Sequence, residues 1–113
     1  MFGLVAKKDS SGALALVEEM HEAGHDLPYV AKQLAQYFRN AMLLKIDLKL
    51  QEYMAEEMLS DELEAISSHL GDFTEQELSR AVRIITENIQ QFKKVPIPQL
   101  PLELTLVEII HGV

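Results

Sequence analysis

Cysteine and tryptophan are absent from this chain of 113 residues, which also has only five glycines and four prolines. Without cysteine, the chain can form no disulfide and offers no thiolate to a metal ion. No apolar run approaches the ~20 residues that a membrane-spanning helix requires, so we expect no membrane association. Lys7 and Lys8 follow a very short apolar patch, which is the reverse of a secretory signal and favours a cytoplasmic protein.

Basic residues are also scarce, because 18 acidic residues stand against ten basic ones and the net charge is −8. Half of the acidic residues lie between Glu52 and Glu77, where there is no Lys or Arg. An acidic domain repels the phosphate backbone, so we expect no direct contact with DNA. The acidic stretch is either a solvated outer face or a patch for a basic partner, and both interpretations stay open.

The remaining composition is that of an ordinary soluble globular protein, with 48% hydrophobic and 25% charged residues. A chain of this length forms one domain and buries roughly two-thirds of its unfolded surface. We find no internal repeat and no low-complexity segment. Residues 1–113 are therefore expected to form a single domain.

Capping signals and an apolar period of three to four residues divide most of the chain into helices. Gly24 supplies the left-handed residue that commonly ends a helix, and Asp26 and Pro28 supply a cap and a fixed φ for the next one. Residues 48–59 have helical propensity but no clear apolar period. The expected helices cover approximately residues 10–23, 28–47, 48–59, 60–71, 74–94 and 101–110.

The helix expected after residue 73 has the strongest local signals. Thr74 and Glu77 form a capping box, and Phe73 occupies the position of a hydrophobic staple. Its apolar stripe consists of Leu78, Val82, Ile85, Ile89 and Phe92. Lys93 and Lys94 are expected to end it, where cations suit the helix dipole. Such a stripe must pack against other helices.

Three prolines between Val95 and Pro101 exclude a helix there, so we expect a surface strap whose apolar residues are covered. The last helix is expected to begin with Pro101. It is apolar on two sides, with Leu104 and Val107 opposite Leu102, and is either central to its own domain or shared with a neighbour. The sequence predicts an all-α protein, a single compact bundle of about five to six helices with a Pro-rich strap before the last helix.

Residues 21–25 read His-Glu-Ala-Gly-His and match the pattern of a zinc-dependent hydrolase. That chemistry needs both histidines on one face of a continuing helix. Gly24 and Pro28 instead indicate that the helix stops before His25, which argues against a zinc site. No Gly-rich loop followed by Lys and Ser or Thr is present to bind a nucleotide. We therefore predict a domain that is not an enzyme and has no catalytic, cofactor-binding or metal-binding residues.

Four segments, in their order along the chain, resemble domain III of the gamma and tau subunits of the bacterial DNA polymerase III clamp loader. They are residues 17–26, 34–44, 88–93 and 98–108. In the first segment, a helix is followed by the pattern Gly, any residue, Asp, which is Gly24 to Asp26 here. The second segment contains Phe38 and Arg39, followed by leucines. The last is similar to the family's closing pattern, with Leu102 and Glu103 as its Leu-Glu pair. The resemblance covers nearly the whole chain.

The resemblance implies a piece of a longer subunit, whose N-terminal ATPase modules bind ATP and magnesium and are absent from this chain. The domain, which would need no cofactor, would be the oligomerisation (collar) domain that joins gamma/tau copies, delta and delta-prime in a ring. That ring loads the sliding clamp in DNA replication. The expected interface residues are Arg39, Leu102, Glu103, Leu104 and Val107. The alternatives are a zinc-dependent hydrolase fragment, resting on residues 21–25, and a helical adaptor unrelated to replication.

Overall fold

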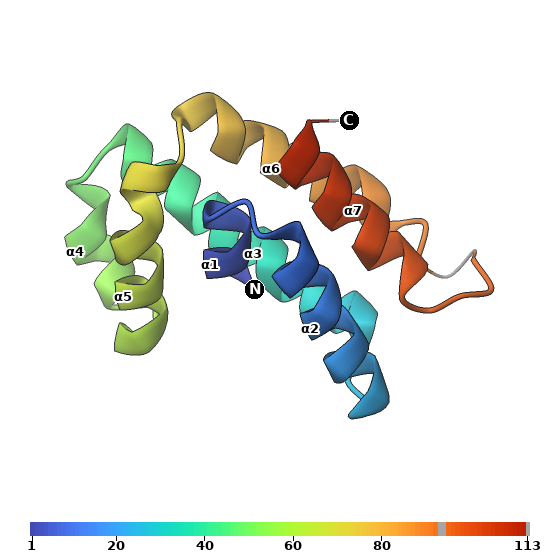
Figure 1. The fold of residues 1–113 in the computed structure, drawn as a ribbon. Helices are drawn as coiled ribbons and strands as arrows, with labels where there is room; N and C mark the ends of the chain where they lie inside the picture. The colour runs from blue at the N-terminus through green and yellow to red at the C-terminus, as the bar shows by residue number, and fades with distance from the viewer. Residues whose placement is uncertain (93–94, 113) are drawn as a thin grey trace.

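The computed structural model describes residues 1–92 and 95–112, which form seven α-helices, one short 3-10 helix and no strand. The elements in chain order are α1 (Phe2–Ala6), α2 (Ser10–Glu22), α3 (Leu27–Ile46), α4 (Leu50–Ala55), α5 (Ser60–His69), η1 (Leu70–Asp72), α6 (Glu75–Ile89) and α7 (Leu100–His111). The prediction of an all-α bundle is confirmed (Figure 1). Within the described residues, no helix is long and apolar enough to cross a membrane.

The longest helix, α3, forms the centre of the bundle and packs most extensively against α6. The Asp26 carboxylate caps α3 by accepting the Tyr29 N–H at 3.3 Å, and Pro28 lies in the first turn. The buried side of α3 consists of Leu27, Val30, Ala31, Leu34, Phe38, Ala41 and Leu44. Figure 1 shows α6 and α7 side by side, while α4 and α5 lie at the other end of the molecule.

The first helix, α1, was not predicted, because five residues are too few to show an apolar period. Its Phe2, Val5 and Ala6 side chains are buried. The Phe2 ring packs against the rings of Phe38 and Phe73, with centroid distances of 5.0 and 5.4 Å. The helix therefore closes the core at the point where α3 meets the residue that precedes α6.

The start of α6 has the predicted capping box. Thr74 Oγ1 accepts the Glu77 N–H at 3.1 Å, while the Thr74 N–H donates to Glu77 Oε1 at 2.9 Å. Phe73 and Leu78, the two residues of the staple, are both buried. These local bonds satisfy two backbone donors that the first turn of a helix leaves free.

The end of α6 differs from the prediction, because the helix stops at Ile89 instead of continuing through Phe92. The Gln91 and Phe92 N–H groups donate to carbonyls three residues back, which tightens the chain into turns. Phe92 is nevertheless buried, as its place in the apolar stripe requires. The predicted helix end at Lys93 and Lys94 lies outside the described residues.

The Pro-rich strap is shorter and less covered than predicted. Leu100 N–H donates to Ile97 O at 3.2 Å, so the chain turns into α7 one residue before Pro101 instead of running extended across the surface. Ile97 is 51% exposed, and the expectation that the apolar residues of the strap are covered is wrong for this side chain. Between residues 48 and 59, only the six residues of α4 are helical before α5 begins.

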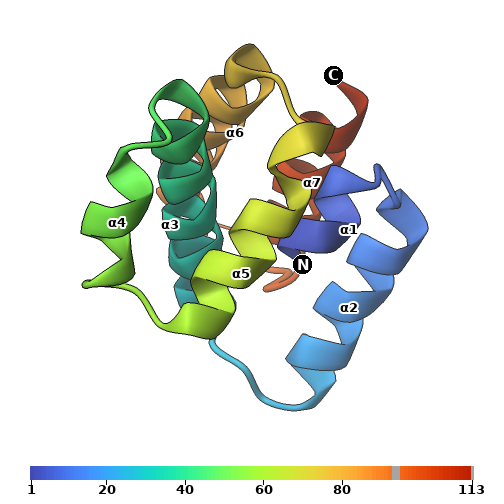
Figure 2. The ribbon, with the colours of Figure 1, turned by 90° about the vertical axis from the view of Figure 1, so that its left-hand side faces the viewer.

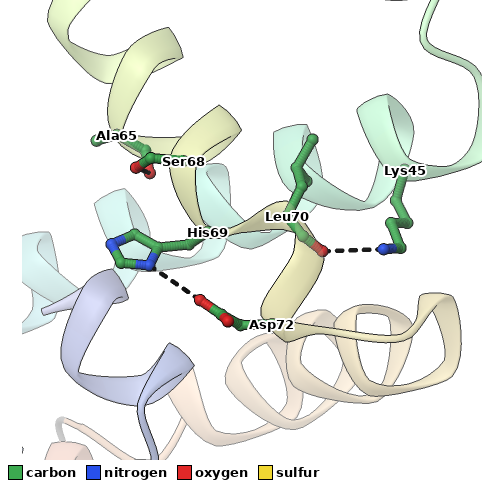
Figure 3. Close-up of polar contacts among 6 residues, drawn as sticks. All are labelled: Lys45, Ala65, Ser68, His69, Leu70 and Asp72. Carbon is green, nitrogen blue, oxygen red and sulfur yellow. Dashed lines mark hydrogen bonds and ion pairs between the residues drawn. The ribbon is translucent and has the colours of Figure 1, made fainter.

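Polar contacts attach the end of α5 to the rest of the bundle (Figure 3). Lys45 Nζ, near the end of α3, donates to the Leu70 carbonyl at 2.9 Å. His69 Nδ1 lies 3.2 Å from the Asp72 carboxylate across η1. The lysine satisfies a carbonyl that a helix end leaves without a backbone donor, and so holds η1 against α3.

Candidate subunit-contact site

The last helix, α7, carries four of the five residues predicted at an interface, and its bounds follow from local chemistry. Pro101 lies in the first turn, where its missing N–H removes no helical hydrogen bond. Gly112 ends the helix in the left-handed conformation, at φ 72°. The buried Thr105 hydroxyl donates to Pro101 O at 2.7 Å and is thereby satisfied inside the helix.

The two apolar sides of α7 have different surroundings. Leu102 and Leu106 are completely buried in the core of this domain, whereas Leu104 is 56% exposed. Val107 and Glu103 are partly exposed, and Leu104 and Val107 share one face because they are three residues apart. The inner side is therefore central to the domain, the outer side is free for a neighbour, and Leu102 is not accessible to another subunit in this structure.

Two polar residues of α6 hold α7 in position. Arg80 donates through Nη2 to Glu108 O at 3.0 Å and through Nη1 to Ile109 O at 3.4 Å. Asn88 Nδ2 donates to Thr105 Oγ1 at 3.1 Å and to the Glu108 carboxylate at 3.2 Å. A cation near the last carbonyls of a helix also suits the helix dipole. These bonds fix the direction in which the outer side of α7 faces.

Reasoning from the sequence did not identify Arg80 and Asn88. They lie eight residues apart on α6, on the side that also carries Ile84, because residues four apart share a face. Ile84 is only 5% exposed although it lies off the predicted apolar stripe. That off-stripe isoleucine is the signal from which a second packed helix could have been inferred.

An open groove of about 400 Å³ lies between the outer side of α7 and the end of α6. Its lining residues are Asn88, Gln91, Pro101, Leu104, Val107 and Glu108. The walls combine exposed apolar surface with side-chain amides and one carboxylate. Such a mixture is typical of a surface that contacts another protein.

Arg39, the fifth predicted residue, lies on the exposed side of α3. Its Nη1 donates to Asn40 Oδ1 at 3.0 Å. None of the hydrogen bonds or ion pairs among residues 1–92 and 95–112 joins it to α7. The structure thus brings Glu103, Leu104 and Val107 together and places Arg39 on another surface.

The His-Glu-Ala-Gly-His segment spans a helix end. α2 ends at Glu22, Gly24 has φ +82°, and the His25 N–H donates to Met20 O at 2.9 Å, a pattern that closes a helix C-terminus. The prediction that the helix stops before His25 is confirmed, so His21 and His25 do not occupy successive turns of one helix. In the part of the chain that the structure describes, no group of three or more His, Asp or Glu side chains could hold a metal ion.

The pKa of Tyr37, on α3, is shifted. Burial, and secondarily the negative charge of Glu62, raises the pKa of the Tyr37 phenol above its usual value. The phenol therefore stays protonated at neutral pH. Its ring stacks on Phe2 with a centroid distance of 5.9 Å, so it acts as a packing residue between α3 and α1.

Comparison with known proteins identifies the family of the chain. A family model described as DNA polymerase III subunits gamma and tau domain III matches residues 1–113. The match spans the whole chain, including every helix that positions the outer side of α7. No curated protein and no solved structure matches the chain.

Proposed function

Because the chain belongs to the DNA polymerase III gamma and tau domain III family, we propose that it is an oligomerisation domain, the collar that holds clamp-loader subunits together. Its partners are further gamma/tau copies, delta and delta-prime, in a cytoplasmic ring that loads the sliding clamp. ATP binding and hydrolysis belong to other modules of the subunit. Family membership argues against an adaptor unrelated to replication.

The observation that carries this proposal is the outer side of α7, where Leu104 is 56% exposed beside Val107. Covering such a half-exposed leucine stabilises a complex by about 1–2 kcal/mol, since full burial of the side chain contributes about 1.5–3 kcal/mol. One domain therefore adds a modest contact, and several copies in a ring add their contributions. This is the behaviour expected of a domain that holds larger subunits together.

The hydrogen bonds from α6 support the same function. Arg80 and Asn88 fix α7 before any partner arrives, so binding does not have to order the helix. The net charge of −8 also fits a domain that contacts other subunits instead of the DNA phosphate backbone.

The proposal is tested by Leu104→Asp in a clamp loader reconstituted from gamma/tau, delta and delta-prime. The matched control is Tyr29→Asp, because Tyr29 is 58% exposed but lies in the first turn of α3, where an acid suits the helix dipole. Gel filtration should show a smaller complex for Leu104→Asp and an intact one for the control, with equal helix content by circular dichroism. A complete assembly containing Leu104→Asp would contradict the proposal.

A further inference from the structure

A second open groove, of about 410 Å³, lies between α3 and α6. Its lining residues are Met42, Ile46, Glu75, Gln76, Ser79 and Arg83. Ile46 is 59% exposed, so part of the apolar surface of the groove is not covered by the domain itself. Exposed apolar surface of this kind, with a polar rim, is typical of a docking site.

Two arginines lie in or beside this groove. Arg83 is exposed, and Arg39 lies one turn before Met42 on the same side of α3, because residues three apart share a face. Neither arginine forms an ion pair within residues 1–92 and 95–112. The acidic residue of the groove, Glu75, is eight residues before Arg83, or about 12 Å along α6.

The outer side of α7 has the complementary composition. Leu104 and Val107 lie between two partly exposed acids, Glu103 on one side and Glu108 on the other. This arrangement follows from helical spacing, since Glu103 and Val107 are four residues apart, as are Leu104 and Glu108. The apolar pair beside Glu103 thus matches an apolar groove that carries Arg83 in its lining.

Arg80 and Asn88 face α7, while Ser79 and Arg83 line the groove with α3. Figure 2 shows α3 and α7 on different sides of α6. We propose that the outer side of α7 of one copy docks into the α3–α6 groove of a second copy. The contact is head to tail, which closes into a ring when the rotation between copies allows it. This inference rests on the proposed function and names its partner surface.

Cross-linking tests the contact directly, because the chain contains no cysteine and introduced thiols are unique. A size-tagged Leu104→Cys chain is mixed with an untagged Ile46→Cys chain and treated with a short bismaleimide. The tagged–untagged product should dominate. The matched control replaces Ile46→Cys by Tyr29→Cys, which is 58% exposed on the same helix but 17 residues away, about 25 Å.

The control should give at least several-fold less product. Equal yields from the two pairs, or a dominant product between two Leu104→Cys chains, would overturn the head-to-tail contact.

A charge exchange tests the ionic part of the contact. Arg83→Glu alone and Glu103→Arg alone should each reduce the yield between Leu104→Cys and Ile46→Cys by about two- to fivefold. Mixing the two reversed chains, with Glu103→Arg on the Leu104→Cys copy and Arg83→Glu on the Ile46→Cys copy, should restore it. Yields unaffected by either reversal would overturn the proposed pairing.

The two proposals fail differently. If Leu104→Asp abolishes assembly of the clamp loader but Leu104→Cys forms no cross-link to Ile46→Cys, the groove assignment is wrong and the oligomerisation function still stands. Assembly that survives Leu104→Asp contradicts the function itself.

Discussion

Truncation of Leu102 should lower the stability of the monomer, whereas truncation of Leu104, only two residues away on α7, should weaken association between subunits. Leu102 is completely buried, so Leu102→Ala leaves a cavity and should lower the free energy of unfolding by about 2–5 kcal/mol. Leu104 is 56% exposed, so Leu104→Ala should change the stability of the monomer by no more than about 0.5 kcal/mol. Leu104→Ala should instead weaken association between subunits.

The assay is urea unfolding followed by far-UV circular dichroism, because the chain contains no tryptophan and is mostly helical. The protein is kept dilute, so that monomer stability alone is measured, and the slope against urea should not change between variants. Leu102→Met serves as the control, because a swap of similar volume usually costs less than about 1.5 kcal/mol. Equal losses of stability for the two alanine variants would refute the assignment of an inner and an outer side.

Three further variants test how the fold is held together. Arg80→Met keeps the apolar stem but removes the donors to the carbonyls of Glu108 and Ile109, so it should lower stability by about 1–2 kcal/mol and speed hydrogen exchange in α7; unchanged exchange there would contradict its holding role. Thr74→Ala removes the side-chain cap of α6 and should cost about 1 kcal/mol in urea unfolding, whereas no loss would mean that the capping box adds nothing. Lys8 has a left-handed φ of 56°, so Lys8→Gly should raise the free energy of unfolding by about 0.5–1 kcal/mol and therefore raise the melting temperature. Lys7 has an ordinary φ of −86°, so Lys7→Gly should lower the melting temperature. The reverse order of the two melting temperatures would refute backbone strain at Lys8.

Helices whose ends carry capping residues or a terminating glycine could be predicted from the sequence. Asp26 and Thr74 cap α3 and α6 as expected, and Gly24 ends the segment after α2 in a left-handed conformation. These signals are local, since a cap and its N–H partner are three residues apart. α1 could not be predicted in the same way, because the burial of Phe2 depends on Phe38 and Phe73, far away in the sequence.

The candidate site was predictable only in part. A helical projection of α7 shows two apolar sides but does not tell which one faces the core, so Leu102 and Leu104 both enter the predicted interface. The answer depends on where α6 lies, and that in turn depends on Arg80 and Asn88, whose partners are 17 to 29 residues away. Arg39 was predicted at the interface from the helix of residues 28–47, and it lies on the exposed side of α3.

Sedimentation equilibrium of the isolated chain over a wide concentration range tests the central claim most directly. The chain has a mass of 12.8 kDa, and the account predicts an average mass that rises above this value with concentration. Leu104→Asp should keep the monomer mass throughout, while Tyr29→Asp should follow the unmodified chain. A mass of 12.8 kDa at every concentration for the unmodified chain, or equal association of the Leu104→Asp variant, would contradict the claim that the outer side of α7 holds subunits together.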